Sequence, residues 1–215
     1  MVAALRLGRA LPGPLRFVAL WWFVGFLQDC VQYYIGHYLH RHNLWVNHVT
    51  LPLTTGLLLW AFSLWQESDV PRMAFRIAIP LYVLVWLVLQ VTVERLDQFS
   101  TYASPISCLL LVCVAAYTIV SLSLRSTEPV WRQEWLWIAS GYMLYFGSEV
   151  VLMPLGNLLF TARPDLFRIY RIFTVCGLVA TLLITGGMLC ARPRLSSGGS
   201  SWPRRWWRPS SSLRS

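Results

Sequence analysis

Two acidic side chains interrupt long apolar segments of this chain: Asp29 in the first such segment and Glu149 in the fifth. An ionised carboxylate at the centre of a bilayer costs roughly 2.5–3.5 kcal/mol on insertion scales, so such groups usually face a protein interior or a wet cavity. Each has companions at four-residue spacing, Gly25 and Tyr33 around Asp29 and Tyr145 before Glu149. Two interpretations remain open. The carboxyl groups either hold helices together or line a functional cavity.

Both carboxylates are predicted to face the interior of a helix bundle, because small and hydrogen-bonding residues share their helical faces. The opposite faces are aliphatic and are predicted to face lipid. They comprise Leu20, Val24, Leu27 and Val31 on the first helix, and Ile138, Val150 and Leu152 on the fifth.

Inside the predicted spans the inner half has no ionisable residue, whereas several ionisable side chains, among them His37 and Glu94, lie at the outer boundary, the end predicted below to face outwards. His48 begins the second segment and Arg171 precedes the sixth, so either could stand opposite the carboxylates. This distribution predicts a water-filled pocket that opens to the outside. The candidate pocket residues are Asp29, Tyr33, His48, Tyr145, Glu149 and Arg171.

All four histidines fall within twelve residues of one another, from His37 to His48. Imidazole is a good zinc or copper ligand, but a helix presents two ligands on one face only at a spacing of three or four residues. His37 and His40 meet that spacing, and no Cys or acidic residue lies near them. We therefore predict no metal and no other cofactor, with His37, His40 and His48 as the candidates if a metal is held. The alternative is that the histidines are ordinary polar residues at a membrane interface.

These residues are carried by six apolar runs, each near the ~20 residues that a helix needs to cross ~30 Å of hydrocarbon. The runs predict an all-α, polytopic bundle of six transmembrane helices. Pro52, Pro80 and Pro105 are expected in first turns, where a missing N–H is tolerated, and Pro154 is expected to end or bend the fifth helix. The predicted spans run from about Phe17 to Gly36, Val49 to Trp65, Arg76 to Val93, Ser104 to Leu124, Trp135 to Leu155 and Ile172 to Ala191.

Composition agrees with a membrane location. Hydrophobic residues make up 56% of the chain and charged residues 13%, which departs from a soluble domain in the membrane direction. The net charge of +9 would suggest nucleic acid in a soluble protein. Here the basic residues flank apolar runs, so lipid headgroups are the expected partner and nucleic acid is not. Every basic residue apart from histidine is Arg, which excludes chemistry that needs a lysine amine.

The distribution of Arg predicts the orientation. Thirteen of them lie on the side of the two termini and five on the other side, so the positive-inside rule places both termini in the cytoplasm. We therefore predict a basic cytoplasmic N-terminus over 1–16, a bundle over 17–191 and a cytoplasmic tail over 192–215. The tail is rich in Arg, Trp and Ser, which predicts disorder and contact with anionic lipid.

Several short segments resemble an uncharacterised group of bacterial integral membrane proteins with six or seven helices. The likeness rests on Leu11-Pro12 and Leu15-Arg16 before Asp29, on Asn43-Leu44-Trp45 followed by His48 and Pro52-Leu53, and on Tyr145-Phe146-Gly147-Ser148. The resemblance implies the helical fold and a bacterial inner membrane, and it implies no activity. Members often have a carboxylate where this chain has Thr54, a His where it has Tyr170 and Arg171, and one more N-terminal helix.

The function expected from these patterns is that of a multi-pass membrane protein whose outward-facing polar pocket binds a small ligand, an ion or a signal. An intramembrane enzyme is the main alternative and would use Asp29, Glu149 or His48 as acid, base or metal ligand. A structural membrane subunit is the third interpretation, favoured if the polar groups pair only with one another. The oligomeric state is left open.

Overall fold

The computed structural model describes residues 13–40, 43–94, 96, 100–127, 129–162 and 167–190, with the backbone alone for 152–162 and 167–173. These residues form six α-helices and one short 3-10 turn, with no strand among them, which confirms the all-α prediction. The helices are α2 (Gly13–His37), α3 (Trp45–Trp65), α4 (Asp69–Thr92), α5 (Ala103–Ser123), α6 (Glu134–Ala162) and α7 (Phe167–Cys190), with η2 (Val130–Arg132) before α6.

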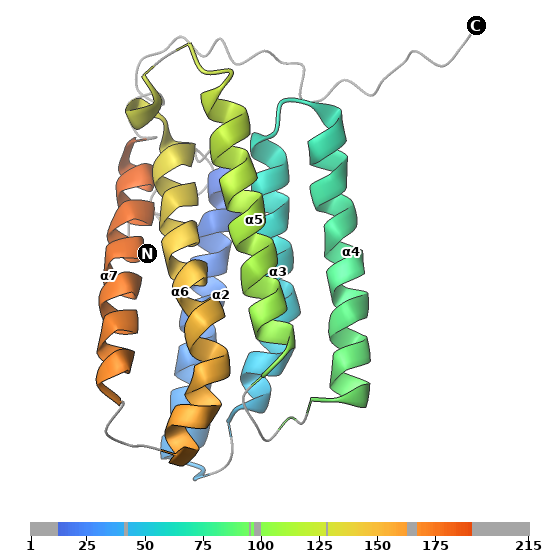
Figure 1. Cartoon of the computed structure of the whole chain (residues 1–215), viewed down its shortest axis with the longest axis vertical. Coiled ribbons are helices and arrows are strands. Elements are labelled where there is room, and N and C mark those ends of the chain that lie inside the picture. Colours follow the sequence, from blue (N-terminus) through green and yellow to red (C-terminus); the bar gives the residue numbers. More distant parts are fainter. Residues whose placement is uncertain are drawn as a thin grey trace, which may run out of the picture.

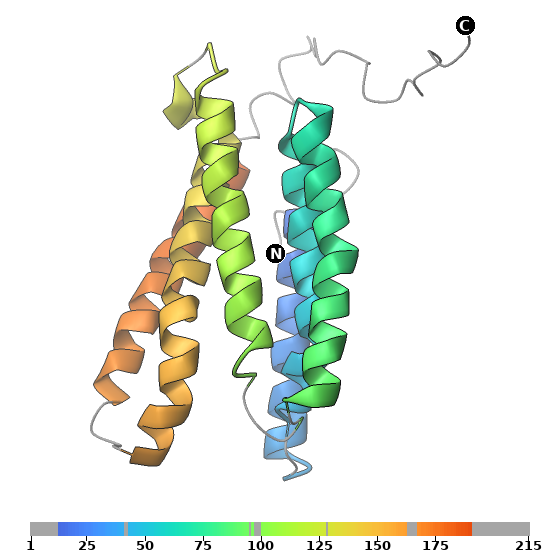
Figure 2. The same ribbon diagram turned by 45° about the vertical axis from the view of Figure 1, so that its right-hand side comes forward.

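The six helices run alternately up and down along one axis (Figures 1 and 2). We call the end where α2 finishes and α3 begins the His37 end, at the bottom of Figure 1, and the opposite end the Trp65 end. The described chain begins at Gly13 and finishes at Cys190, both at the Trp65 end. Neighbouring helices pack as α2 with α3, α3 with α4 and α5, α4 with α5, α5 with α6, and α6 with α7.

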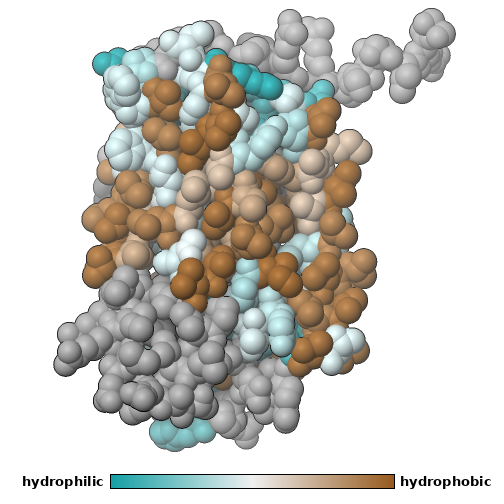
Figure 3. Space-filling model, viewed as in Figure 1, coloured by the Kyte–Doolittle hydropathy of each residue, from teal (hydrophilic) through white to brown (hydrophobic). Residues whose placement is uncertain are grey.

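The surface between the two ends is that of a membrane protein. Within the described residues, α3, α4 and α5 are long and apolar enough to cross a bilayer. Figure 3 shows hydrophobic side chains over much of the visible face between the ends, with the most hydrophilic surface at the Trp65 end. On α4, whose main contacts are with α3 and α5, exposed aliphatic residues include Ile77, Leu81, Leu84, Val88 and Val91.

The hydrophobic core occupies the Trp65 half of the bundle. It combines the beginning of α2 with the end of α3, the end of α5 and the beginning of α6, because these segments meet at that end. Fully buried members include Leu15, Leu58, Phe62, Ile138 and Tyr142. The other half of the bundle contains the polar side chains described below.

Several sequence expectations about these helices are wrong. The helices α3 and α4 begin before their apolar runs, at Trp45 and Asp69, so Pro52 and Pro80 lie inside them rather than in first turns. Helix α6 continues past Pro154 to Ala162. Apolar windows underestimate helix length because the polar first turns lie at the interface, outside the hydrocarbon.

Ile138 was predicted to face lipid and is instead fully buried. Its Cγ1 atom lies against Gly187 of α7, because α6 is packed between α5 and α7 and so has two buried faces. Val150 is partly buried, and the side chain of Leu152 lies outside the described set. On α2, the predicted aliphatic residues Leu20, Leu27 and Val31 are exposed.

Adjacent glycines on α7 provide a matched test of this close packing. A Cβ at Gly187 would lie 2.6 Å from Ile138 Cγ1 and 2.9 Å from the Glu134 carbonyl oxygen, whereas a Cβ at Gly186 would meet nothing within 4 Å. We expect Gly187→Ala to lower the free energy of unfolding by about 1–3 kcal/mol through overpacking. Gly186→Ala should be neutral or stabilising by up to about 1 kcal/mol, because alanine restricts the unfolded chain.

The measurement is reversible unfolding in mixed micelles, followed by circular dichroism for both variants. Equal stabilities for the two alanine variants would contradict the close α6–α7 contact.

Candidate ligand cavity

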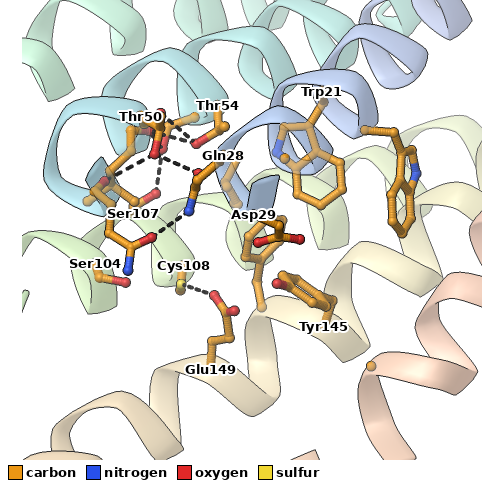
Figure 4. Close-up of a pocket in the computed structure, with 18 of the residues that line it drawn as sticks. Trp21, Gln28, Asp29, Thr50, Thr54, Ser104, Ser107, Cys108, Tyr145 and Glu149 are labelled. Atoms are coloured by element: carbon orange, nitrogen blue, oxygen red, sulfur yellow. Dashed lines mark hydrogen bonds between the residues drawn. The ribbon is translucent and has the colours of Figure 1, made fainter. Parts of the chain in front are cut away.

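A cavity of about 530 Å³ lies between α2, α3, α5, α6 and α7, mostly in the His37 half of the bundle. Its volume is in the range of pockets that bind small molecules. Its wall has three parts, shown in Figure 4: a pair of carboxyl groups, a group of aromatic rings, and a row of amide and hydroxyl side chains.

The cavity exists because α2 packs along α3 and reaches α6 chiefly through aromatic rings. Trp21 of α2 meets Tyr142 of α6 edge to face, with ring centroids 5.2 Å apart. Beyond this contact, small residues line both sides, including Gly25 on α2 and Gly177 on α7. A Cβ at either glycine would meet nothing within 4 Å, so space remains where side chains would otherwise interlock.

The two carboxyl groups, Asp29 of α2 and Glu149 of α6, both line this cavity. Glu149 Oε2 accepts a hydrogen bond from the Cys108 thiol at 3.2 Å, and the Tyr145 hydroxyl also interacts with this carboxyl group. Asp29 is accessible and has no hydrogen bond or ion pair within the described part of the chain. One acid is therefore held by neighbours, and the other is open to a ligand.

The amide and hydroxyl wall links α2 to α3. Asn47 Oδ1 accepts hydrogen bonds from the side-chain amides of Gln28 and Gln32, the latter at 2.6 Å. Thr50 donates to Gln28 Oε1 at 2.6 Å, and Asn43 donates to the Gln32 carbonyl oxygen at 3.0 Å. Side-chain hydrogen bonds between membrane helices stabilise their association, so this row fixes α2 against α3 and forms one rigid side of the cavity.

The aromatic wall is centred on Trp21. Its ring lies edge to face with Trp22, Tyr145 and Phe146, at centroid distances of 5.3, 6.1 and 6.2 Å. Edge-to-face pairs at these distances are favourable beyond the area that they bury. The wall is therefore apolar and fixed in place.

A second polar cluster lies at the His37 end, which we call the Glu94 cluster: His48, Gln90, Glu94 and Ser100. Gln90 Nε2 donates both to His48 Nδ1 at 2.8 Å and to Glu94 Oε2 at 2.7 Å. Glu94 Oε1 accepts from Ser100 and from the backbone N–H groups of Tyr102 and Ala103. This carboxylate thereby satisfies the N-terminus of α5, where backbone N–H groups lack partners inside the helix.

The structure brings three of the six predicted pocket residues together, namely Asp29, Tyr145 and Glu149. Tyr33 does not line the cavity; it is exposed and stacks on His37 with ring centroids 5.2 Å apart. His48 is buried in the Glu94 cluster. The Arg171 side chain lies outside the described set, as do the N-terminus up to residue 12 and the tail over 192–215.

The candidate metal ligands do not converge. His37 and His40 are exposed, whereas His48 is buried between α3 and α4. Within the described residues, no three His, Cys, Asp or Glu side chains are grouped as a metal site would require.

Sequence reasoning missed the uncharged part of the wall and Glu94. Gln28 and Gln32 on α2, and Asn43 and Asn47 around the beginning of α3, are pairs at four-residue spacing. Two such pairs could have predicted a polar seam between α2 and α3, because residues four apart share a helical face. Side-chain amides carry no charge, so a pattern of ionisable groups does not contain them.

The chain was also compared with known proteins. No family model matches it, and no curated protein and no solved structure is similar to it.

Proposed function

We propose that the chain crosses the membrane six times, with both termini in the cytoplasm, and that its cavity binds a small polar ligand entering from outside. The observation that carries this proposal is that Asp29 and Glu149, 120 positions apart, line one cavity in the His37 half. The packed core in the Trp65 half supports access from the His37 end alone. We also propose that this membrane is a bacterial inner membrane, as the resemblance described above implies.

Binding is better supported than intramembrane catalysis. An enzyme using both carboxylates and His48 would need all three within reach of one substrate atom. His48 is instead engaged with Gln90 and lies 3.4 Å from Glu94, in a cluster that caps α5. A purely structural role suits the Glu94 cluster and the amide row, but it does not explain the accessible Asp29 carboxylate.

A thiol introduced at Gly25 tests access to the cavity, since this position lines the cavity and has free space around it. The background replaces the five native cysteines, with serine at position 108 so that a hydroxyl can still donate to Glu149. In intact cells, we expect Gly25→Cys to react with a membrane-impermeant thiol reagent. Tyr38→Cys, at the exposed His37 end, should react too, whereas Val70→Cys, at the exposed Trp65 end, should react only after permeabilisation.

Ala115→Cys in the buried core is the negative control. Reaction at position 70 but not at position 38 in intact cells would reverse the orientation. Reaction at position 38 with none at position 25, even in detergent, would mean that the cavity is closed and would overturn the binding proposal.

A further inference from the structure

We propose that the ligand of this cavity is a small organic cation: a protonated amine that carries an apolar or aromatic group. This inference rests on the proposed function and adds the chemical class of the ligand. It depends on four features of the wall, namely its charge, the open state of Asp29, the aromatic rings and the direction of the hydrogen bonds.

The wall contains two acids and no base among its described lining residues. Asp29 and Glu149 come from helices on opposite sides of the cavity, so both can approach one positive group placed between them (Figure 4). Two carboxylates sharing a site within low-dielectric surroundings disfavour a further negative charge and favour a positive one. The electrostatics therefore select against an anionic ligand.

Asp29 is the carboxyl group that is available to a ligand. Glu149 is already hydrogen-bonded by Cys108, whereas Asp29 has neither a hydrogen bond nor an ion pair within the described residues. An unpaired carboxylate in a membrane span is costly, and ionisable groups there typically pair or mark a ligand path. An ammonium group beside Asp29 would provide the missing partner and up to three hydrogen-bond donors.

The aromatic rings favour an organic rather than an inorganic cation. Trp21, Trp22, Tyr145 and Phe146 all line the cavity. Figure 4 shows the Tyr145 ring beside the two carboxyl groups. Indole and phenol faces attract cations, and they also bury apolar groups. A bare metal ion would use only the charge of this wall, whereas an amine with an aromatic or aliphatic part would use both its charge and its surface.

The threonine hydroxyls present acceptors. Thr50 donates to Gln28, while Thr54, Thr55 and Thr181 donate to backbone carbonyl oxygens of their own helices. Each hydroxyl has a single hydrogen, so these groups have only lone pairs left to offer a ligand. These threonine acceptors match a ligand that donates, as an ammonium group does.

Ligand protection of the thiol introduced by Gly25→Cys tests this inference in purified, reconstituted full-length protein. The probe is phenethylamine, which is protonated at pH 7. Its matched controls are 2-phenylethanol, which is neutral and of the same shape, and phenylacetate, which is an anion. We expect phenethylamine to slow thiol modification in a saturable way, with both controls at least about tenfold weaker, as loss of a close charge pair implies.

Variants that remove a charge test whether protection by phenethylamine depends on the two carboxyl groups of the cavity. Adding Asp29→Asn or Glu149→Gln should weaken protection by phenethylamine by about tenfold or more. The same changes at exposed sites of the Trp65 end, Asp69→Asn and Glu67→Gln, should leave protection unchanged. The quantity compared is the protection constant, because the variants can alter the intrinsic reactivity of the thiol.

Equal protection by phenethylamine and 2-phenylethanol would overturn the cationic assignment and leave the binding cavity intact. Protection by phenylacetate alone, by sodium chloride alone, or by none of these probes would also overturn it. A thiol that never reacts would overturn the proposed function itself, so the two failures are distinguishable.

Discussion

Replacement of Glu94 by alanine is expected to lower the free energy of unfolding by about 3–5 kcal/mol, the range for removing one partner of a buried charged network. The Glu94 side chain is only 2% exposed, and its Oε2 atom lies 3.4 Å from His48 Nδ1. It accepts from Gln90 at 2.7 Å and from the backbone N–H groups of Tyr102 and Ala103 at 2.8 Å each. The alanine variant would leave the N–H of the buried Ala103 without this acceptor and would remove the carboxylate that Gln90 and the Tyr102 N–H also contact.

The loss can be measured by reversible unfolding in mixed micelles, with Glu67→Ala as the control. Glu67 is exposed at the Trp65 end, so its replacement should change stability by no more than about 0.5 kcal/mol. Glu94→Gln should fall between the two, because an amide keeps one acceptor oxygen and loses the charge at the α5 N-terminus. A Glu94→Ala variant as stable as the Glu67 control would show that water replaces the carboxylate at this site.

The sequence predicted the helical fold because long apolar runs admit little else within a bilayer. Unpaired backbone groups are so costly in hydrocarbon that an apolar run of that length must form a helix. Helix ends were predicted less well for the same reason. The segments 45–48 and 69–76 belong to helices but contain polar or charged residues, so an uninterrupted apolar run does not include them.

The two carboxylates were predictable as cavity residues because a charged group inside an apolar run is costly in hydrocarbon and so usually faces a cavity or the protein interior. Tyr33 was not, although it lies four residues after Asp29: its side chain is exposed and stacks on His37. Four residues also turn a helix by slightly more than one full turn, so a stripe drifts away from its starting face.

His48 shows a different limit of sequence reasoning. Its position near the predicted outer boundary agreed with a place in the cavity wall, but its partners are Gln90 at the end of α4 and Glu94 just after it, 42 and 46 positions later. No local sequence pattern predicts such a pairing, because it depends on how α3 packs against α4. The prediction that Ile138 faces lipid was wrong for the same reason, since the position of α7 decides whether a second face of α6 is buried.

Replacement of Tyr142 by phenylalanine is expected to stabilise the protein, by about 1 kcal/mol. Tyr142 is fully buried, and within the described residues its hydroxyl has no hydrogen-bond partner. A buried polar group without a partner costs about 1–3 kcal/mol, and removing only the hydroxyl relieves that cost. The ring itself would remain stacked on Phe146, with centroids 5.8 Å apart, and edge to face with Trp21.

The matched control is Tyr82→Phe, which removes the same atom from a buried tyrosine whose hydroxyl donates to the Ala103 carbonyl oxygen at 3.2 Å. This variant should be destabilised by about 0.5–1.5 kcal/mol, the usual net value of one hydrogen bond. Tyr142→Ala should lower the free energy of unfolding by about 3–5 kcal/mol, because it removes the ring that joins α2 to α6.

The unfolding midpoints of the three variants in mixed micelles test these expectations. Opposite signs for the two phenylalanine variants are the expected result, and a Tyr142→Phe loss as large as that of Tyr82→Phe would mean that the hydroxyl is hydrogen-bonded in the membrane-embedded protein. Since Trp21 and Phe146 also form the aromatic wall, Tyr142→Phe should leave ligand protection at position 25 unchanged, whereas Tyr142→Ala should weaken it.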